Sequence, residues 1–210
     1  MSEASIIPLR GPRAQRPLAE RDDDELMLLV RAGAADAMAV VVGRYHAKLT
    51  SFCAKQTGDS IAAEELVQEA FLRLWRNRAS YRAEGKLCTL LYTAVRNLCA
   101  NHSRWWRRRS RWIRPDGPRA AGEQEPAAEP SAALPSAIDA MIERERLRDV
   151  DAAVLELGTK QRQAVLLRFE HGLPYDQIAT ILGTNESTAR SRVHLGLAAL
   201  RARLALGAVR

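Results

Sequence analysis

The sequence predicts an all-α protein with two helical domains joined by a linker rich in proline, alanine and glutamate. Apolar residues recur with helical period through most of the chain, and no segment is convincing as a strand. Five prolines fall in residues 115–136, where they prevent a continuous helix and favour extended chain. We predict a flexible tail over residues 1–21, a first domain over 22–114, the linker over 115–136 and a second domain over 137–210.

Four helices with short connections are predicted in the first domain, as in an α-helical bundle. The first begins near Asp22, where three consecutive aspartates suit the free N–H groups of a helix start. The second covers Asp36–Thr57, and the third covers Ile61–Asn77 with Ser60 as its cap. A loop over Ser80–Lys86 precedes the fourth helix. The apolar residues expected on the buried side of that helix are Leu87, Leu90, Leu91, Val95 and Leu98.

Helical period resumes at Ile138 in the second domain. Thr159 is a candidate cap for the next helix. A short helix is predicted over Tyr175–Leu182, ended by Gly183, and a final long helix begins near Glu186. The second domain is therefore also helical throughout.

The charge balance is basic. A formal charge of +7 and a pI near 9.8 favour a polyanionic partner, either nucleic acid or an anionic membrane surface. The longest apolar run, Met38–Gly43, is far shorter than the ~18–20 residues of a membrane-spanning helix. The first residues lack the apolar core of a secretory signal. We therefore expect a cytoplasmic protein without direct membrane insertion.

The three cysteines are odd in number and widely spaced, so they do not form a disulfide framework. Cys99 and His102 lie three residues apart, which raises a zinc hypothesis. No further ligand pair completes such a site, and reduced cysteines packed as small apolar residues are the favoured interpretation. We predict no metal and no cofactor. No catalytic pairing of a nucleophile and a base stands out either, so an enzyme is not expected.

The segment Tyr175–Val193 has the pattern of a helix-turn-helix. Ala179 lets two helices cross closely, Gly183 fits the turn, and Asn185 can cap the second helix. Such a helix enters the major groove of DNA with its N-terminal residues toward the bases. The alternative is a solvated face of an ordinary bundle. The candidate DNA contacts are Thr188, Arg190, Ser191, Arg192 and His194.

Two segments of the first domain carry opposite charge patterns. Arg104–Trp112 interleaves arginines with tryptophans, which suits phosphates and base stacking. A solvated helix end or an interfacial membrane segment remains an alternative. Glu64–Arg76 places acidic and amide groups on one side of a helix. DNA would repel this face, so it suits a protein partner, although an ordinary exposed face has the same pattern.

Together these segments resemble the extracytoplasmic-function (ECF) sigma factors of the sigma-70 superfamily. Glu64–Arg76 is similar to the family's core-polymerase-binding helix, with its acidic-leucine-valine-glutamine-glutamate run at Glu65–Glu69. Ser80–Tyr92 resembles the loop and helix that recognise and open the −10 promoter element, and Arg96-Asn97-Leu98 matches a step of the same helix. Leu157–Leu204 resembles the −35-binding domain. The first domain would be sigma2-like and the second sigma4-like.

The resemblance implies a function and a set of site residues. The chain would bind core RNA polymerase, recognise both promoter elements and open the promoter for transcription initiation. The residues implied in polymerase binding are Glu65, Gln68, Glu69, Phe71 and Trp75. Those implied at the −10 element are Tyr81, Arg82, Lys86, Tyr92, Arg96, Asn97, Arg104, Arg107 and Arg108. The helix-turn-helix contacts named above would bind the −35 element.

The expected partners are bacterial core RNA polymerase, promoter DNA and an anti-sigma factor, with no small-molecule substrate. Some positions depart from the family pattern. Leu90 replaces a usual tryptophan, Asn101 replaces an aspartate, and Leu195, Gly196 and Leu197 replace a common Arg-Ala-Arg run. The base preference at −35 therefore does not follow from the family. A free-standing helix-turn-helix regulator is the main competing hypothesis, and it has no use for a polymerase-docking helix.

Overall fold

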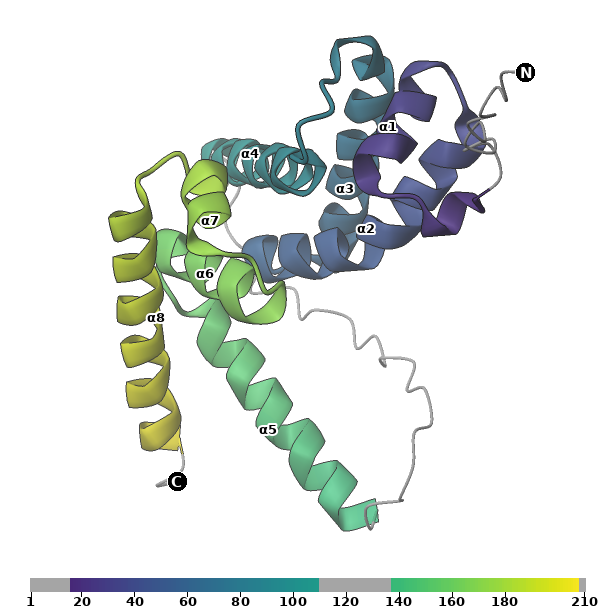
Figure 1. Cartoon of the computed structure of the whole chain (residues 1–210). Helices are drawn as coiled ribbons and strands as arrows, with labels where there is room; N and C mark the ends of the chain where they lie inside the picture. The colour runs from purple at the N-terminus through teal and green to yellow at the C-terminus, as the bar shows by residue number, and fades with distance from the viewer. Residues whose placement is uncertain (1–15, 110–136, 208–210) are drawn as a thin grey trace, which may run out of the picture.

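The computed structural model describes residues 16–109 and 137–207, and these are helical apart from short turns and loops (Figure 1). No strand occurs within these two ranges, so the all-α prediction is confirmed there. The predicted linker, residues 115–136, lies outside the described residues. Among the residues described, no helix is both long and apolar enough to span a bilayer.

The first half contains the four predicted helices. They are α1 (Asp23–Arg31), α2 (Ala35–Thr57), α3 (Ser60–Arg76) and α4 (Leu87–Arg109). Short 3-10 helices lie at Leu18–Glu20 and Arg78–Ser80. A capping box starts α1, because Asp22 accepts from the Glu25 N–H at 2.8 Å and the Glu25 carboxylate accepts from the Asp22 N–H. Gly58, with a left-handed φ of +72°, ends α2.

The cap of α3 is one residue earlier than predicted. The Asp59 side chain accepts from the N–H groups of Ile61 and Ala62, both at 3.0 Å. Ser60 is instead the first helical residue. A carboxylate is the stronger acceptor at a helix start, where the dipole favours negative charge. The prediction of Ser60 as the cap was wrong.

The second half contains four α-helices and one π-helical turn. They are α5 (Ala137–Leu155), α6 (Thr159–Val165), η3 (Leu166–Glu170, π-helical), α7 (Tyr175–Leu182) and α8 (Glu186–Gly207). Gly158 occupies the cap position of α6 without a side-chain bond, and Thr159 is the first helical residue, so the prediction of Thr159 as the cap was wrong. Gly183, in the left-handed region at φ +60°, makes the turn between α7 and α8, as predicted.

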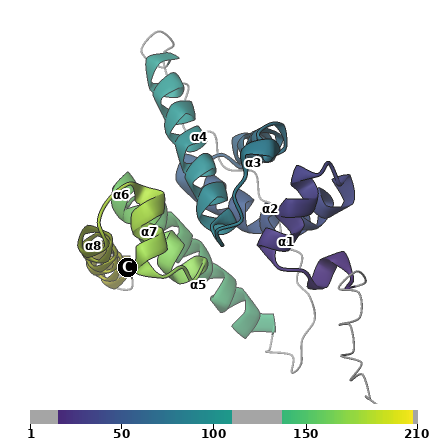
Figure 2. The ribbon, with the colours of Figure 1, turned by 45° about the horizontal axis from the view of Figure 1, so that its top comes forward.

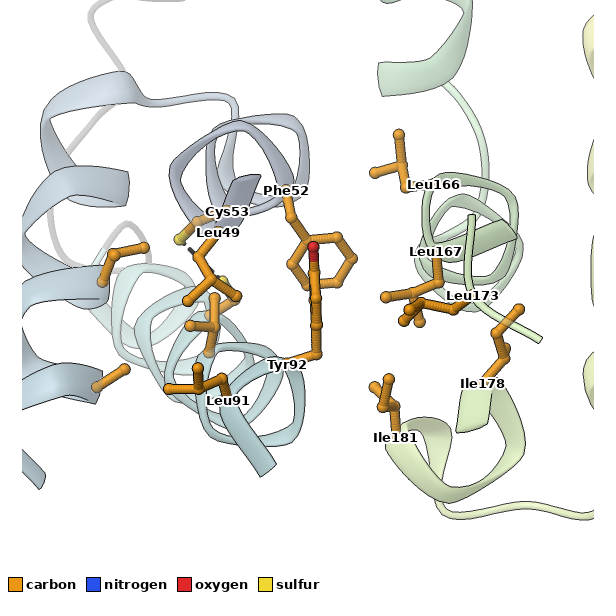
Figure 3. Packing of buried hydrophobic residues seen from close by; sticks show 14 of the residues in the cluster. Leu49, Phe52, Cys53, Leu91, Tyr92, Leu166, Leu167, Leu173, Ile178 and Ile181 are labelled. Atoms are coloured by element: carbon orange, nitrogen blue, oxygen red, sulfur yellow. Dashed lines mark hydrogen bonds between the residues drawn. The ribbon is translucent and has the colours of Figure 1, made fainter. Parts of the chain in front are cut away.

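The two halves pack against each other. In Figure 2, α4 lies between α3 on one side and α7 on the other, and contacts join it to both helices. Figure 3 shows Phe52 of α2 and Tyr92 of α4 facing the apolar side chains of the second half, among them Leu167, Leu173 and Ile181. All five are at most 8% exposed and belong to one continuous core. The core thus extends across both sequence halves.

Polar contacts reinforce this packing. The Lys55 ammonium, on α2, lies 3.1 Å from the carboxylates of both Glu170 and Asp151 in the second half. The Arg162 guanidinium of α6 donates to the Lys55 carbonyl, and Arg96 of α4 donates to the Ile181 carbonyl of α7. Each half therefore supplies donors to the other half.

His171, which follows η3, is a buried titratable group in the packing between the halves. Its ring centroid lies 5.8 Å from that of Phe52 and 5.1 Å from that of Tyr92, and its buried Nε2 has no hydrogen-bond partner among the described residues. Burial lowers the pKa of His171, the Glu170 carboxylate opposes this shift, and Lys55 and Lys48 add to it. The folded protein therefore binds the proton less readily than the unfolded chain does.

We expect stability to fall on acidification below about pH 6.5, the ordinary pKa of histidine, because the unfolded chain then takes up the proton first. Above that pH the contribution of His171 is complete. His171→Phe, which keeps a ring without a titratable group, should lose this part of the pH dependence. Thermal unfolding followed by circular dichroism between about pH 7 and about pH 5 measures the difference between the two proteins. Identical pH profiles would contradict the prediction.

Candidate polymerase-binding and nucleic-acid surfaces

The acidic face of α3 is on the surface, as predicted. Glu65 and Gln68 are exposed, and Glu69 is half-buried. The Glu69 carboxylate accepts from Arg73 Nε at 2.6 Å, and this bond lowers the pKa of Glu69. The face therefore combines negative charge with an amide that can donate and accept.

Beside this face runs a groove of about 480 Å³ between α2 and α3. We call it the α2–α3 groove, and it is lined by Met38, Val42, His46, Gln68, Phe71, Leu72 and Trp75. Leu72 is 48% exposed and lines the groove, so it adds exposed apolar area at this place. Phe71 is only 6% exposed and its ring stacks on that of His46, so it forms the floor of the groove and part of the core.

The groove contains residues that sequence reasoning missed. Met38, Val42 and His46 lie at successive turns of α2 and contribute the wall opposite α3. Their spacing of four residues was a visible signal for a shared helix face. The sequence does not reveal that this face borders α3. The structure thus places apolar groups from two helices beside the exposed polar groups of α3.

A second pocket, of about 410 Å³, lies between α3, α4 and the loop of residues 81–86. We call it the loop pocket. Among the predicted −10 residues, Tyr81, Arg82 and Lys86 line it, together with Arg73 and Leu90. Tyr81 is 8% exposed, and its ring packs into the core, whereas Arg82 and Lys86 are exposed. The pocket therefore combines apolar walls with cationic groups at its edge.

Leu90 was predicted on the buried side of α4, and that prediction was wrong. It is 46% exposed, whereas Leu87, Leu91, Val95 and Leu98 are at most 6% exposed. These four residues follow a stripe with steps of three and four along the helix. Leu90 lies off that stripe, on the side where α4 faces the loop pocket.

The middle of α4 points to the second half of the chain. Tyr92 is 1% exposed and packs against Phe52 and His171. Arg96 donates to the Ile181 carbonyl of α7 and, through Nη2, to the Asn97 side chain at 2.6 Å. Partial burial lowers the pKa of the Arg96 guanidinium. In this arrangement Tyr92 and Arg96 serve the packing between the halves, and their DNA-binding role stays a prediction.

The basic end of α4 is described in part. Arg104 and Trp105 are exposed, the tryptophan by 50%. Helix α4 continues to Arg109, but the side chains of Arg107 and Arg108 lie outside what the structure describes. Their phosphate contacts stay a prediction.

The helix-turn-helix has the predicted form. Asn185 Oδ1 accepts from the Thr188 N–H at 2.7 Å and so caps α8. Ala189 and Val193 face the core at 0% and 2% exposure. Of the predicted −35 contacts, three are exposed and two are half-buried. The exposed residues are Arg190, Ser191 and His194, and the half-buried residues are Thr188 and Arg192.

Arg190 is held in place on this face. Its guanidinium carbon lies 4.5 Å from the centre of the Tyr175 ring of α7, and its Nη2 donates to Glu186 at 2.7 Å. These contacts orient the side chain while leaving it exposed. An exposed arginine near the start of the second helix suits either a guanine edge or a phosphate.

Packing explains two of the three positions that replace the family's Arg-Ala-Arg run. A Cβ atom added to Gly196 would lie 2.5 Å from Val165 Cγ2, so α8 crosses α6 too closely for a side chain at this position. Leu197 is half-buried against the core, and Leu195 is 56% exposed. Gly196 and Leu197 therefore serve helix packing, whereas nothing in the structure explains Leu195.

Cys53 and Cys99 are buried as free thiols, and Cys88 is a half-buried free thiol. Cys99 Sγ lies 3.1 Å from Cys53 Sγ in the core between α4 and α2. The hydrogen bond with the Cys99 thiol, together with burial, raises the pKa of Cys53, and burial raises that of Cys88 to about 11. Within the described residues no group of three or more His, Cys, Asp or Glu side chains is placed to hold a metal ion.

Comparison with known proteins connects these surfaces to one family. The family profile described as Sigma-70 region 2 matches residues 41–112, and that described as Sigma-70, region 4 matches residues 147–200. The ECF RNA polymerase sigma factor SigW of Bacillus subtilis is 28% identical over 183 residues, covering 83% of this chain and 92% of that protein. SigL of Mycobacterium tuberculosis, also an ECF RNA polymerase sigma factor, is 29% identical over 81% of this chain and 91% of its own.

Solved structures of similar proteins have the same fold as this chain. CnrH in complex with the cytosolic domain of CnrY matches with a TM-score of 0.63 at 17% identity, over 88% of this chain and 97% of CnrH. The sigma factor RpoE in complex with the anti-sigma factor NepR from Bartonella quintana matches with a TM-score of 0.53 at 23% identity, over 86% and 94%. With both family regions in order and nearly full-length relatives of one kind, this chain belongs to the ECF sigma factors of the sigma-70 family.

Proposed function

We propose that this protein binds bacterial core RNA polymerase, recognises the −10 and −35 elements of a promoter and promotes promoter opening. The observation that carries the proposal is the presence of both sigma-70 regions on one chain, in order. Residues 22–114 form the domain for polymerase and the −10 element, and residues 137–210 form the domain for the −35 element. Residues 115–136 connect them.

The α2–α3 groove and the acidic face beside it form the docking surface for polymerase. An exposed Leu72 and the groove walls supply apolar contact, while Glu65, Gln68 and Glu69 provide polar contacts that fix orientation. Trp75, half-buried in the same groove, adds aromatic area. Phe71 supports the surface from below.

The two cationic surfaces bind separate stretches of promoter. Arg82 and Lys86 at the edge of the loop pocket attract the phosphates around a base that is extruded into the pocket, while Asn97 and Arg104 extend the contact along α4. The exposed residues of α8 enter the major groove of the −35 element. Because Tyr92 and Arg96 now contact the second half, the halves must separate before these two residues reach DNA.

An anti-sigma factor is the proposed regulator. CnrH and RpoE, which share the fold, were solved with CnrY and with the anti-sigma factor NepR. Our chain has an exposed Leu72 and an open groove that such a partner could cover. We place the protein in the cytoplasm, where polymerase and promoters are found, and assign it no catalytic activity of its own.

The docking surface can be tested with Gln68→Ala combined with Leu72→Ala. Both residues line the groove and are exposed, so the fold should tolerate the changes. We expect binding to core polymerase to weaken by at least about tenfold, as for the loss of an interface hot spot. Titration of core polymerase against the labelled chain measures the affinity, and run-off transcription on genomic fragments measures function.

Ile61→Ala is the matched control. Ile61 lies on the same helix and is 74% exposed, but it does not line the groove. The affinity of the Ile61→Ala variant for core polymerase should equal that of the wild type. A double variant with unchanged affinity would rule out the groove as the docking surface. A wild-type chain that binds promoter DNA but not core polymerase would favour the free-standing regulator.

A further inference from the structure

We propose that Asp24, on α1, is a positioning residue that holds the loop of residues 81–86 in the shape needed to receive an extruded −10 base. The proposal rests on the function proposed above and concerns how the loop pocket is built. Asp24 lies outside the residues matched by the region 2 profile, which begins at residue 41. It was not among the site residues predicted from the sequence.

The Asp24 carboxylate is bonded to both ends of the loop. Its Oδ1 accepts from the Tyr81 hydroxyl at 2.7 Å, and its Oδ2 accepts from the Gly85 N–H at 2.7 Å. The two partners lie 57 and 61 residues away in sequence, so these bonds join α1 to a distant segment. Hydrogen bonds to an ionised carboxylate are short and about twice as strong as neutral ones.

The three aspartates at the start of α1 make different contacts. Asp22 caps the helix by accepting from the Glu25 N–H. Asp23 accepts from Arg44 at 2.9 Å and from the Tyr45 hydroxyl, so it connects α1 to α2. Since these two residues already cap and anchor the helix, Asp24 is not needed for either task. Both of its oxygens are directed at the loop.

These bonds determine the shape of the loop pocket. Tyr81 lines the pocket at the start of the loop, and Gly85, with φ +66°, makes the turn that leads to Lys86. The other side-chain polar contact described for this loop, the ion pair between Lys86 and Glu84, is local and exposed. Among the side-chain hydrogen bonds and ion pairs described for the loop, those of Asp24 are the ones that connect it to another helix. Without the Asp24 carboxylate, the loop would no longer be held in one conformation that can receive a base.

The hydroxyl of Tyr81 is suited to this bond at all working pH values. Burial and the Asp24 carboxylate both raise the pKa of Tyr81. The phenol therefore stays protonated and remains a donor. A neutral donor facing a carboxylate gives a stable hydrogen bond without a competing charge.

Asp24→Ala removes both bonds, and Asp23→Ala is the matched control because it removes two bonds in the same helical turn without touching the loop. Hydrogen exchange of the Gly85 amide and trypsin cleavage after Arg82 and Lys86 report on loop order. We expect both to increase in Asp24→Ala and to stay near wild type in Asp23→Ala.

Function is read on the complete complex of each chain with core polymerase, on a promoter fragment selected by the wild-type complex. Permanganate oxidation of unpaired thymines measures opening. For Asp24→Ala we expect core binding as in the wild type and promoter opening reduced by at least about tenfold, given the loss of two charge-assisted bonds. Asp24→Asn keeps one acceptor oxygen, so its rate of promoter opening should lie between those of Asp24→Ala and the wild type.

A loop that becomes mobile while opening stays at the wild-type rate would overturn the proposal. An unchanged loop in Asp24→Ala would overturn it as well. Equal losses of core binding and opening would point to a general structural role and also refute it. A wild-type chain that binds no core polymerase, or opens no promoter, would instead refute the proposed function. The measurements of loop order on the free chain do not depend on that function, so they test the contact between Asp24 and the loop separately.

Discussion

Replacing Phe52 with alanine is expected to lower the free energy of unfolding by about 3–5 kcal/mol, the usual range for a large aromatic residue removed from a core. The Phe52 side chain is fully buried. Its ring meets Tyr92 edge-on at 5.5 Å and His171 edge-on at 5.8 Å, and such pairs add about 0.5–1.5 kcal/mol beyond burial. Because the ring touches both halves of the chain (Figure 3), its loss weakens the core and the packing between the halves together.

Urea unfolding followed by circular dichroism measures this effect. Leu28→Ala is the control, because Leu28 is a large apolar residue that is 42% exposed on α1. Its change should cost less than about 0.5 kcal/mol, as is usual for surface positions. Equal losses in the two variants would mean that the contacts of Phe52 in the core contribute little to stability.

The helices were predictable because their signals are local. Helix α7 was predicted over Tyr175–Leu182 and is found there, while α2 starts one residue before its predicted start and ends as predicted. In both cases a period of three to four residues identifies the helix, and a glycine in left-handed conformation fixes its end. Such information lies within a few residues of each element.

The helix caps show where local signals are insufficient. Asp59 and Ser60 are adjacent and both suit a cap, yet only the backbone path into α3 decides which side chain reaches the free N–H groups. At α6 the polar Thr159 was predicted, and Gly158 has the position instead. The path depends on how each helix packs, which a short window of sequence does not contain.

The packing between the halves is a long-range property. Tyr92 and Arg96 were assigned to DNA by resemblance, and both contact the second half. Arg96 and its partner Ile181 lie 85 residues apart. An apolar period shows that a face will be buried, but it does not show which helix covers it.

The candidate site was predictable in part for the same reason. Surface residues such as Gln68 and Arg190 are exposed where the helical period placed them. Neighbours from other helices were missed, because His46 comes next to Gln68, and Asp24 next to Tyr81, only through tertiary packing. The exposure of these residues is thus observed, while their roles in binding remain proposals.

Replacing Arg162 with methionine is expected to cost about 2–4 kcal/mol, although the residue looks like an ordinary surface charge in the sequence. Its Nη1 donates to the carbonyls of Lys55 and Gln56 at 3.2 and 3.3 Å. Its Nη2 donates to the carbonyls of Leu155 and Leu157, the latter at 3.0 Å. One guanidinium thereby caps the C-terminal ends of α2 and α5, where helix carbonyls lack partners and the dipole favours a cation.

Methionine keeps most of the apolar stem of Arg162 but supplies no donor, so the four carbonyls lose a charged partner. Arg162→Lys should recover only part of the loss, because an ammonium cannot reproduce the planar fork that reaches both helix ends. Lys160→Met is the matched control, since Lys160 is exposed on the same helix and should cost less than about 0.5 kcal/mol. Urea unfolding of the three variants measures these losses in the free energy of unfolding. If Arg162→Met is as stable as Lys160→Met, water replaces the guanidinium at both helix ends, and the hydrogen bonds of Arg162 contribute nothing net to the stability of the protein.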